Sequence, residues 1–160
     1  MARSRSHMPA ALRRRGRFSM PCSVELACVD PEHVRTIWPI VAPRLRRAIR
    51  RTGLSAFADI ERDVLAGRAL LWLALNGASG AATIDAVAAT RLELTETGMV
   101  CIITACEGQT MARWLPLISG IETYAKAEGC RGMRVYGRRG WLRALNGYRQ
   151  THVIIQKELR

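Results

Sequence analysis

The sequence lacks an uninterrupted apolar run of about 18 residues or more, which is the length that a membrane-spanning helix needs. The nearest candidate, residues 69–89, is interrupted by Asn76, Gly77 and Asp85, and this pattern favours a hairpin. The chain also has only three histidines, and none of them stands at a metal-ligand spacing from a cysteine. We therefore expect no membrane contact and no structural metal.

Acidic residues are scarce as well, with 13 Asp and Glu against 25 Lys and Arg, so the formal net charge is +12. Half of that excess lies in residues 1–19, whose six arginines are Arg3, Arg5, Arg13, Arg14, Arg15 and Arg17. This segment has no acid, no apolar periodicity and no apolar core of a secretory signal. We therefore predict a basic, disordered arm, and an arm of this charge could make weak contacts with nucleic acid.

A second basic cluster closes the first expected helix and consists of Arg44, Arg46, Arg47, Arg50 and Arg51. Two interpretations of it stay open. Arginines at this place complement the negative end of the helix dipole, and they would also suit an anion or nucleic-acid patch. The aromatic and glycine interleaving of known nucleic-acid modules is absent, which favours the first interpretation.

Length and composition indicate one globular domain, which we place at residues 20–160. With 160 residues, 49% of them apolar and 24% charged, the chain can bury one core but is too short for two ordinary domains. Its five cysteines, Cys22, Cys28, Cys101, Cys106 and Cys130, are odd in number and lie mostly in apolar, strand-like sequence. Reduced, buried thiols in a cytoplasmic protein are therefore expected.

The first part of the domain combines a strand signal with strong helix signals. A strand is expected at residues 23–29. Asp30 and Pro31 then mark the start of a helix, because an Asp cap followed by Pro at the first helical position is a helix-start signature. This helix should run to about Arg51, bend at its two internal prolines and stop at Gly53.

The middle of the chain predicts a second helix and an antiparallel meander. The helix is expected from Ser55 to Gly67, with its apolar residues on one face. Residues 69–75 then read as a strand, Asn76-Gly77 as a hairpin turn and residues 82–94 as the returning strand.

The last third has the most specific pattern. After a turn at residues 95–98, it predicts a strand at 99–105, a helix at 111–127 that kinks or starts late at Pro116, a strand at 133–136, a short helix at 141–148 and a final alternating strand. Glycines past the last periodic residues stop both helices. The element order is β-α-α-β-β-β-α-β-α-β, which indicates an α/β fold with a mixed sheet.

Three stretches of this last third carry a family resemblance: residues 121–130 (IETYAKAEGC), 133–136 (MRVY) and 141–148 (WLRALNGY). Together they resemble the core of the GCN5-related N-acetyltransferase (GNAT) superfamily. In that family the first helix follows the strand that holds acetyl-CoA, and the second runs into a Gly-Phe or Gly-Tyr. The resemblance covers roughly residues 21–160 and is strongest in the last third. It implies a GNAT-like fold with a central twisted sheet, and acetyl-CoA as acyl donor.

The resemblance also implies where acetyl-CoA lies. Its pantetheine arm would follow Ile102, Ile103, Thr104 and Cys106, and its pyrophosphate would lie over Gly108, Gln109, Thr110, Met111 and Ala112. Free N–H groups at the helix start would bind the pyrophosphate. Trp114 departs from the family pattern, because an indole stands where a hydrogen or methyl is expected. Either the register is shifted, with Gly108 as the residue of close approach, or the phosphate cradle is degraded.

Three residues are the candidates for proton transfer. Glu107 is the acid placed to deprotonate the acceptor amine, although an acid there would also suit a helix start. Arg143 stands where many family members have a tyrosine that protonates the departing thiolate, and an arginine could stabilise that thiolate or bind phosphates. Tyr148 is close by in sequence, at the position of the family's core aromatic. Because the family transfers the acyl group directly, Cys101 and Cys106 need no nucleophilic role.

Two functional hypotheses follow from the resemblance. The first is an acyl-CoA-dependent N-acyltransferase that acts on an amine of a small molecule or protein. The alternative is a catalytically silent GNAT-fold protein that acts by binding a protein or nucleic acid, since its phosphate loop is similar to the eroded loops of phage and prophage acetyltransferase-like proteins. The acceptor and the oligomeric state are not encoded in any readable motif.

Overall fold

One mixed sheet organises the computed structural model, which describes residues 24–77 and 81–159. Its strands are β1 (Val24–Cys28), β2 (Ala69–Asn76), β3 (Thr83–Thr95), β4 (Gly98–Gly108) and β5 (Gly132–Val135). They lie side by side in chain order, the first four antiparallel and β5 parallel to β4. The predicted α/β fold with a mixed sheet is confirmed, and the arm predicted at residues 1–19 lies outside the described residues.

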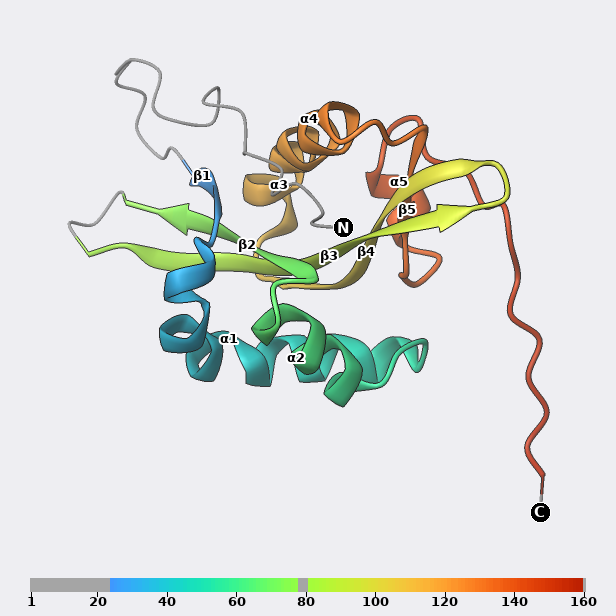
Figure 1. The fold of residues 1–160 in the computed structure, drawn as a ribbon, viewed down its shortest axis with the longest axis horizontal. Helices are drawn as coiled ribbons and strands as arrows, with labels where there is room; N and C mark the ends of the chain where they lie inside the picture. Colours follow the sequence, from blue (N-terminus) through green and yellow to red (C-terminus); the bar gives the residue numbers. More distant parts are fainter. Residues whose placement is uncertain (1–23, 78–80, 160) are drawn as a thin grey trace, which may run out of the picture.

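Helices cover both faces of this sheet (Figure 1). One face carries α1 (Pro31–Thr52) and α2 (Phe57–Leu65), and the other carries α3 (Met111–Trp114), the 3₁₀ turn η2 (Leu115–Leu117) and α4 (Ile118–Ala127). The larger apolar core lies between α1, α2 and the sheet, where Val41 and Leu45 are 0% exposed. A smaller cluster under α4 contains Trp72 and Tyr124, whose ring centroids lie 5.4 Å apart in an edge-to-face arrangement.

The bounds of α1 follow from local chemistry. The Asp30 side chain accepts a hydrogen bond from the Glu32 N–H at 3.0 Å, and Pro31 occupies the first turn, where no N–H is needed. Gly53 ends the helix in the left-handed conformation at φ 65°, and its N–H donates to the Ile49 carbonyl. Two prolines lie inside α1, whose first turns run at an angle to the rest (Figure 1). The predicted start, bend and end are confirmed.

The segment that links β4 to β5 is helical but broken. Residues 111–127 form three pieces, α3, η2 and α4, and Pro116 lies in the middle one. The helix is interrupted there because the proline ring prevents it from continuing. Gly129, at φ 76°, follows the end of α4. The two parallel strands are therefore neighbours joined by a kinked helical segment, as the order of elements predicts.

Three elements differ from the sequence prediction. Asn76-Gly77 is not a two-residue turn, because Asn76 still pairs with Thr83 across β2 and β3 and the connection is longer. The helix α5 (Trp141–Ala144) is one turn long and does not reach Tyr148. The final strand is not formed, and residues 148–159 contain no helix or strand. A strand needs a neighbour for its N–H and C=O groups, and in the described part of the chain none lies beside this segment.

Candidate functional site

β4 changes course where its pairing with β5 ends. Thr104 is an extra residue between the pairs that Ile103 and Ala105 make with β3, which is a β-bulge. The last pair between β4 and β5 joins Ile103 to Val135, whereas β4 itself continues to Gly108. The bulge therefore coincides with the point at which the two parallel strands part.

A pocket lies at this point. It is formed by the end of β4, the end of α1 and the segments that follow β4 and β5. Its lining residues are Ala48, Arg51, Thr52, Thr104, Ala105, Cys106, Glu107, Gly108, Met111, Trp114, Tyr136, Arg138 and Trp141. The pocket encloses about 80 Å³, so it suits one end of a ligand, since whole small-molecule sites measure about 300–1,000 Å³.

Arg44 ties α1 to the end of the sheet beside the pocket. Its guanidinium donates to the Glu107 carboxylate at 2.6 Å and to the carbonyls of Ile84 and Asp85 at 2.7 and 2.9 Å. Arg47 adds a contact with Glu107 at 3.4 Å. Asp85 is the extra residue of a second bulge, in β3 opposite β2. Arg44 thus binds a carbonyl at a place where the strand pairing is interrupted.

Glu107 is held as a carboxylate by these arginines. Its side chain is 10% exposed, and burial alone would raise its pKa. The hydrogen bonds and charges of Arg44 and Arg47 outweigh burial, so the pKa of Glu107 is lowered. A carboxylate of low pKa is a weak proton acceptor. Its predicted role as the base stays a prediction.

Trp114 belongs to the packed core. It is 4% exposed, and its Nε1 donates to the Gln109 carbonyl at 2.9 Å. A Cβ added to Gly108 would stand 2.6 Å from the Trp114 ring and 2.6 Å from the Ala86 Cβ. Gly108 is therefore the residue that makes room for the indole, and the departure from the family pattern has an explanation in packing.

The predicted cofactor residues fall into three groups. Ile102 and Ile103 are 0% and 1% exposed and belong to the core. The pocket is lined by Thr104, Cys106, Gly108 and Met111. Gln109, Thr110 and Ala112 lie exposed in the turn from β4 into α3 and in α3 itself. Their predicted contacts with acetyl-CoA stay predictions.

The other two proton-transfer candidates do not line the pocket. Arg143 is exposed on α5. The Tyr148 hydroxyl donates to Glu122 on α4 at 2.9 Å, and burial together with this hydrogen bond raises the pKa of Tyr148. This contact holds the segment after α5 against α4. The catalytic roles of Arg143 and Tyr148 stay predictions.

Sequence reasoning did not assign five polar or aromatic pocket residues to the donor site: Arg51, Thr52, Tyr136, Arg138 and Trp141. Of these, Arg51 entered it only as a member of the basic cluster of the first helix. Tyr136 directly follows β5, and its N–H donates to the Ile103 carbonyl at 3.0 Å. It therefore stands at the carboxyl end of the two parallel strands. Ligands of open α/β sheets bind outside the carboxyl ends of strands, and this rule was the signal that could have found Tyr136.

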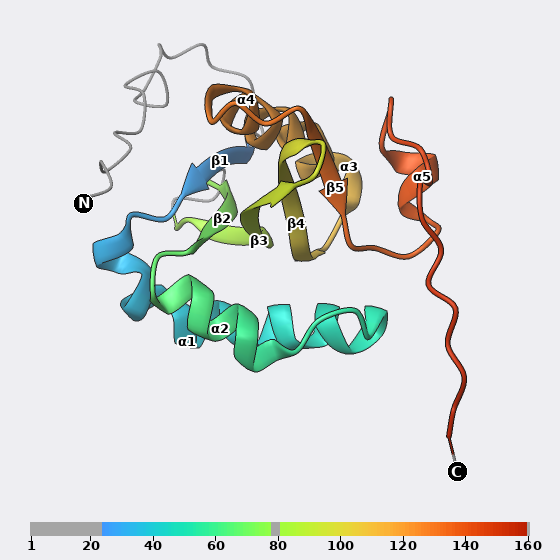
Figure 2. The same ribbon diagram turned by 45° about the vertical axis from the view of Figure 1, so that its right-hand side comes forward.

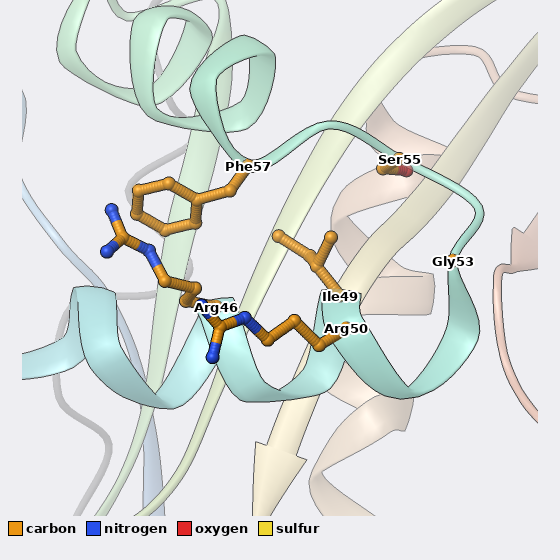
Figure 3. Close-up of a pocket in the computed structure, with 6 residues that line it drawn as sticks. All are labelled: Arg46, Ile49, Arg50, Gly53, Ser55 and Phe57. Carbon is orange, nitrogen blue, oxygen red and sulfur yellow. The ribbon is translucent and has the colours of Figure 1, made fainter.

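The basic cluster of α1 has several different surroundings. Arg44 and Arg47 contact Glu107, whereas Arg51 lines the pocket. A separate, open depression of about 440 Å³ at the α1–α2 junction is lined by Arg46, Ile49, Arg50, Gly53, Ser55 and Phe57 (Figure 3). There the Arg46 guanidinium lies over the Phe57 ring, 4.2 Å from its centroid. The cluster is therefore not a uniform charged face.

Cys106 lines the pocket as a protonated thiol. Burial, and then the charge of Glu107, raise the pKa of Cys106 to about 12. Burial likewise raises the pKa of Cys101 to about 12. Because the thiolate is the nucleophilic form, a raised pKa makes both thiols weaker nucleophiles at neutral pH.

Two further features concern metal ligands and membrane spans in the part of the chain that the structure describes. Within residues 24–77 and 81–159, no three His, Cys, Asp or Glu side chains gather as metal ligands would. Among the same residues, no helix has the length and apolar character needed to cross a membrane.

Solved acetyltransferase structures share this fold. An aminoglycoside acetyltransferase from an uncultured soil metagenomic sample, solved with sisomicin, matches at a TM-score of 0.60 and 10% identity, over 86% of this chain and 97% of its own. A predicted acetyltransferase from Clostridium acetobutylicum, solved with acetyl-CoA, matches at a TM-score of 0.56 and 13% identity, over 85% of this chain and 96% of its own. A GNAT family acetyltransferase from Staphylococcus aureus matches at a TM-score of 0.55 and 12% identity, over 88% of this chain and 100% of its own.

The likeness lies in the fold rather than in the sequence. No protein-family model and no curated protein matches the sequence. The structural matches nevertheless span nearly the whole of each neighbour and most of this chain. The resemblance seen at residues 121–148 is therefore confirmed for the architecture, and this chain has the fold of the GNAT-family acetyltransferases.

Proposed function

We propose that this protein transfers an acyl group from an acyl-CoA to an amine. The observation that carries the proposal is the parting of β4 from β5 after the Ile103–Val135 pair, with the pocket at that place. A strand edge without a neighbour offers N–H and C=O groups that can pair with the amides of a pantetheine arm. An acetyltransferase of the same fold that was solved with acetyl-CoA supports this donor.

The residues around the pocket fit one end of such a donor. The thioester would enter the space of about 80 Å³, and the pyrophosphate would lie outside it, over residues 109–112. Those residues are exposed, and Trp114 packs into the core rather than across them. Arg51 and Arg138 line the pocket, and their charges favour a ligand that carries phosphates.

The pocket also offers a proton donor for the reaction. In acyl transfer the amine nitrogen forms a bond to the acyl carbon, the C–S bond breaks, the amine gives up a proton and the thiolate takes one up. The hydroxyls of Thr52 and Thr104 already donate to backbone carbonyls at 3.2 Å, and Glu107 is ion-paired. Within the described chain the Tyr136 hydroxyl makes no such hydrogen bond. We assign to Tyr136 the protonation of the thiolate.

Titration calorimetry with acetyl-CoA tests the donor site. We expect saturable binding by the full chain, with one molecule bound per chain. Binding followed by release of CoA in the presence of a primary amine supports the transferase. Binding without release of CoA from any amine tested favours the silent alternative, and no binding at all rejects an acyl-CoA site.

The assignment of Tyr136 is tested by two matched substitutions. Tyr136→Phe should lower kcat by roughly 100-fold and leave the Kd of acetyl-CoA unchanged, because only the proton donor is lost. Tyr148→Phe removes the same group from the residue bonded to Glu122. A large loss of kcat in Tyr148→Phe, with none in Tyr136→Phe, would move the role to Tyr148.

A further inference from the structure

The end of the described chain exposes an apolar segment, residues 149–159. Its large hydrophobic side chains are unusually open to solvent: Val153 is 71% exposed, Ile154 67%, Ile155 93% and Leu159 88%. In two views the segment runs away from the domain toward the C-terminal mark (Figures 1 and 2). A continuous group of exposed apolar residues indicates a contact surface.

The composition of this segment suits a β-strand. Val153, Ile154 and Ile155 are β-branched, and such residues are enriched in strands because they pack well on a pleated surface. The hydrogen bond from Tyr148 to Glu122 holds the start of the segment against α4. Beyond that anchor, every residue of the segment is exposed. The segment is thus a strand former that has no strand beside it in the described chain.

β5 forms an edge of the sheet that lacks an outer neighbour among the described residues. It stands last in the strand order and pairs only with β4. None of its four residues is buried, whereas six consecutive residues of β4 are. An exposed edge strand presents unpaired N–H and C=O groups to any strand that can approach.

We propose that residues 149–159 pair with the β5 edge of a second copy of this chain, so that two copies exchange these segments in a symmetric dimer. The exchange gives both unpaired features a partner at once, and a closed twofold arrangement stops the assembly at two copies. The segment leads away from its own sheet (Figure 2), which favours pairing between copies over pairing with its own β5. Tyr136 and Arg138 follow β5 and line the pocket, so the added strand would border the candidate site.

Charge should govern how strongly the two copies associate. Arg134 lies on β5, and the segment would bring two cations, Arg149 and Lys157, and one acid, Glu158, beside it. The net charge of +12 adds a general repulsion between copies. Salt screens such repulsion while leaving apolar burial intact. The dimer should therefore strengthen as the salt concentration rises.

Light scattering coupled to size exclusion tests the proposal on the full chain and on a chain truncated after Tyr148. We expect the full chain to be a dimer that dissociates on dilution, and the truncated chain to be a monomer with an unchanged circular dichroism spectrum. A full chain that is monomeric at every concentration and salt level overturns the proposal. A truncated chain that remains dimeric overturns it as well.

A labelled peptide of residues 149–159 tests the partner surface. Fluorescence anisotropy should detect its binding to the truncated chain. The Ile155→Pro peptide, which loses an N–H donor, should bind at least tenfold more weakly, whereas the Ile155→Val peptide keeps a β-branched residue and should bind nearly as well. Failure of the unmodified peptide to bind would overturn the assignment to β5.

Discussion

The parts of the molecule before and after residue 128 are packed very differently. The first part, with β1 to β4 and the helices α1, α2 and α4, holds nearly all the buried apolar residues of the described chain. After residue 128 the only buried apolar residue in the described part is Leu145, at 7% exposure. Yet two of the three stretches that carry the family resemblance, residues 133–136 and 141–148, belong to this second part. Most of the buried core and two of the three stretches of family resemblance therefore lie in different residues.

This difference separates a scaffold from a site. The scaffold fixes the end of β4 through Arg44 and Glu107, whereas Tyr136, Arg138 and Trp141 reach the pocket from thinly packed elements. Elements with few buried contacts open at a lower free energy than the core does. Ligand contacts on that side can thus rearrange while the core stays folded.

Two tryptophans provide the sharpest comparison of the two parts. Trp114 and Trp141 have ring centroids 6.0 Å apart, but Trp114 is 4% exposed whereas Trp141 is half-buried. Trp114→Ala should lower the free energy of unfolding by about 3–5 kcal/mol, because a large core side chain is lost. Trp141→Ala should cost about 1–2 kcal/mol. Urea denaturation measures the loss of unfolding free energy in each variant. Equal losses would show that the two parts of the molecule do not differ in packing.

The ion pair of Glu107 should make the scaffold sensitive to acid. Glu107→Gln should cost about 2 kcal/mol at neutral pH, because Arg44 loses a charged partner. Since the pKa of Glu107 is lowered in the folded state, its contribution is complete above the unfolded value of about 4.3 and disappears as the pH falls through the folded value. The free energies of unfolding of the unmodified protein and of Glu107→Gln, measured against pH, should therefore converge in acid.

The exposed pair of Asp59 and Arg62 is the control for that experiment. Both side chains are more than half exposed, so Asp59→Asn should change stability little at any pH. A similar loss of unfolding free energy in Glu107→Gln and Asp59→Asn would mean that net charge, and not the contact with Arg44, sets the acid sensitivity.

Gly108 and Gly140 differ in how much space surrounds them. Gly108→Ala should cost about 1–3 kcal/mol, because the new methyl group meets Ala86 and Trp114 at 2.6 Å. Gly140→Ala meets no atom within 4 Å and serves as the control. Thermal unfolding of both variants measures the difference, and an unaffected Gly108→Ala would show that Trp114 moves easily.

The smallest effect concerns thiol reactivity in the two parts. Cys106 and Cys130, which follows α4, are both half-buried, and burial raises the pKa of both thiols, more strongly that of Cys106, to about 12. Alkylation at pH 8 should modify Cys130 before Cys106, and peptide mass spectrometry can follow the order. Rapid modification of Cys106 would show that the pocket opens far more often than its burial indicates.

Local chemistry was sufficient to predict much of the fold. The cap at Asp30, the stop at Gly53 and the break at Pro116 each depend on neighbouring residues, and all three are confirmed. The partners of Glu107 were beyond this reasoning, because Arg44 stands 63 residues earlier in the chain. The same holds for Tyr136, which reaches the pocket only through the pairing of β5 with β4.

The final strand shows the complementary limit. The sequence of Val153, Ile154 and Ile155 has the composition of a strand, but a strand also requires a partner edge, and no local pattern specifies one. The surroundings of Trp114 met the same limit, because they include Ala86, which stands far from it in the sequence.

The strand order has a consequence for how the molecule folds. Because the strands lie in chain order, β2, β3 and β4 can assemble through connections of short sequence separation. Contacts of low separation form quickly, since little loop-closure entropy is lost. The parallel pair of β4 and β5 must wait until the intervening helical segment has docked. The pocket, which exists only where those two strands part, should therefore be among the last features to appear during refolding.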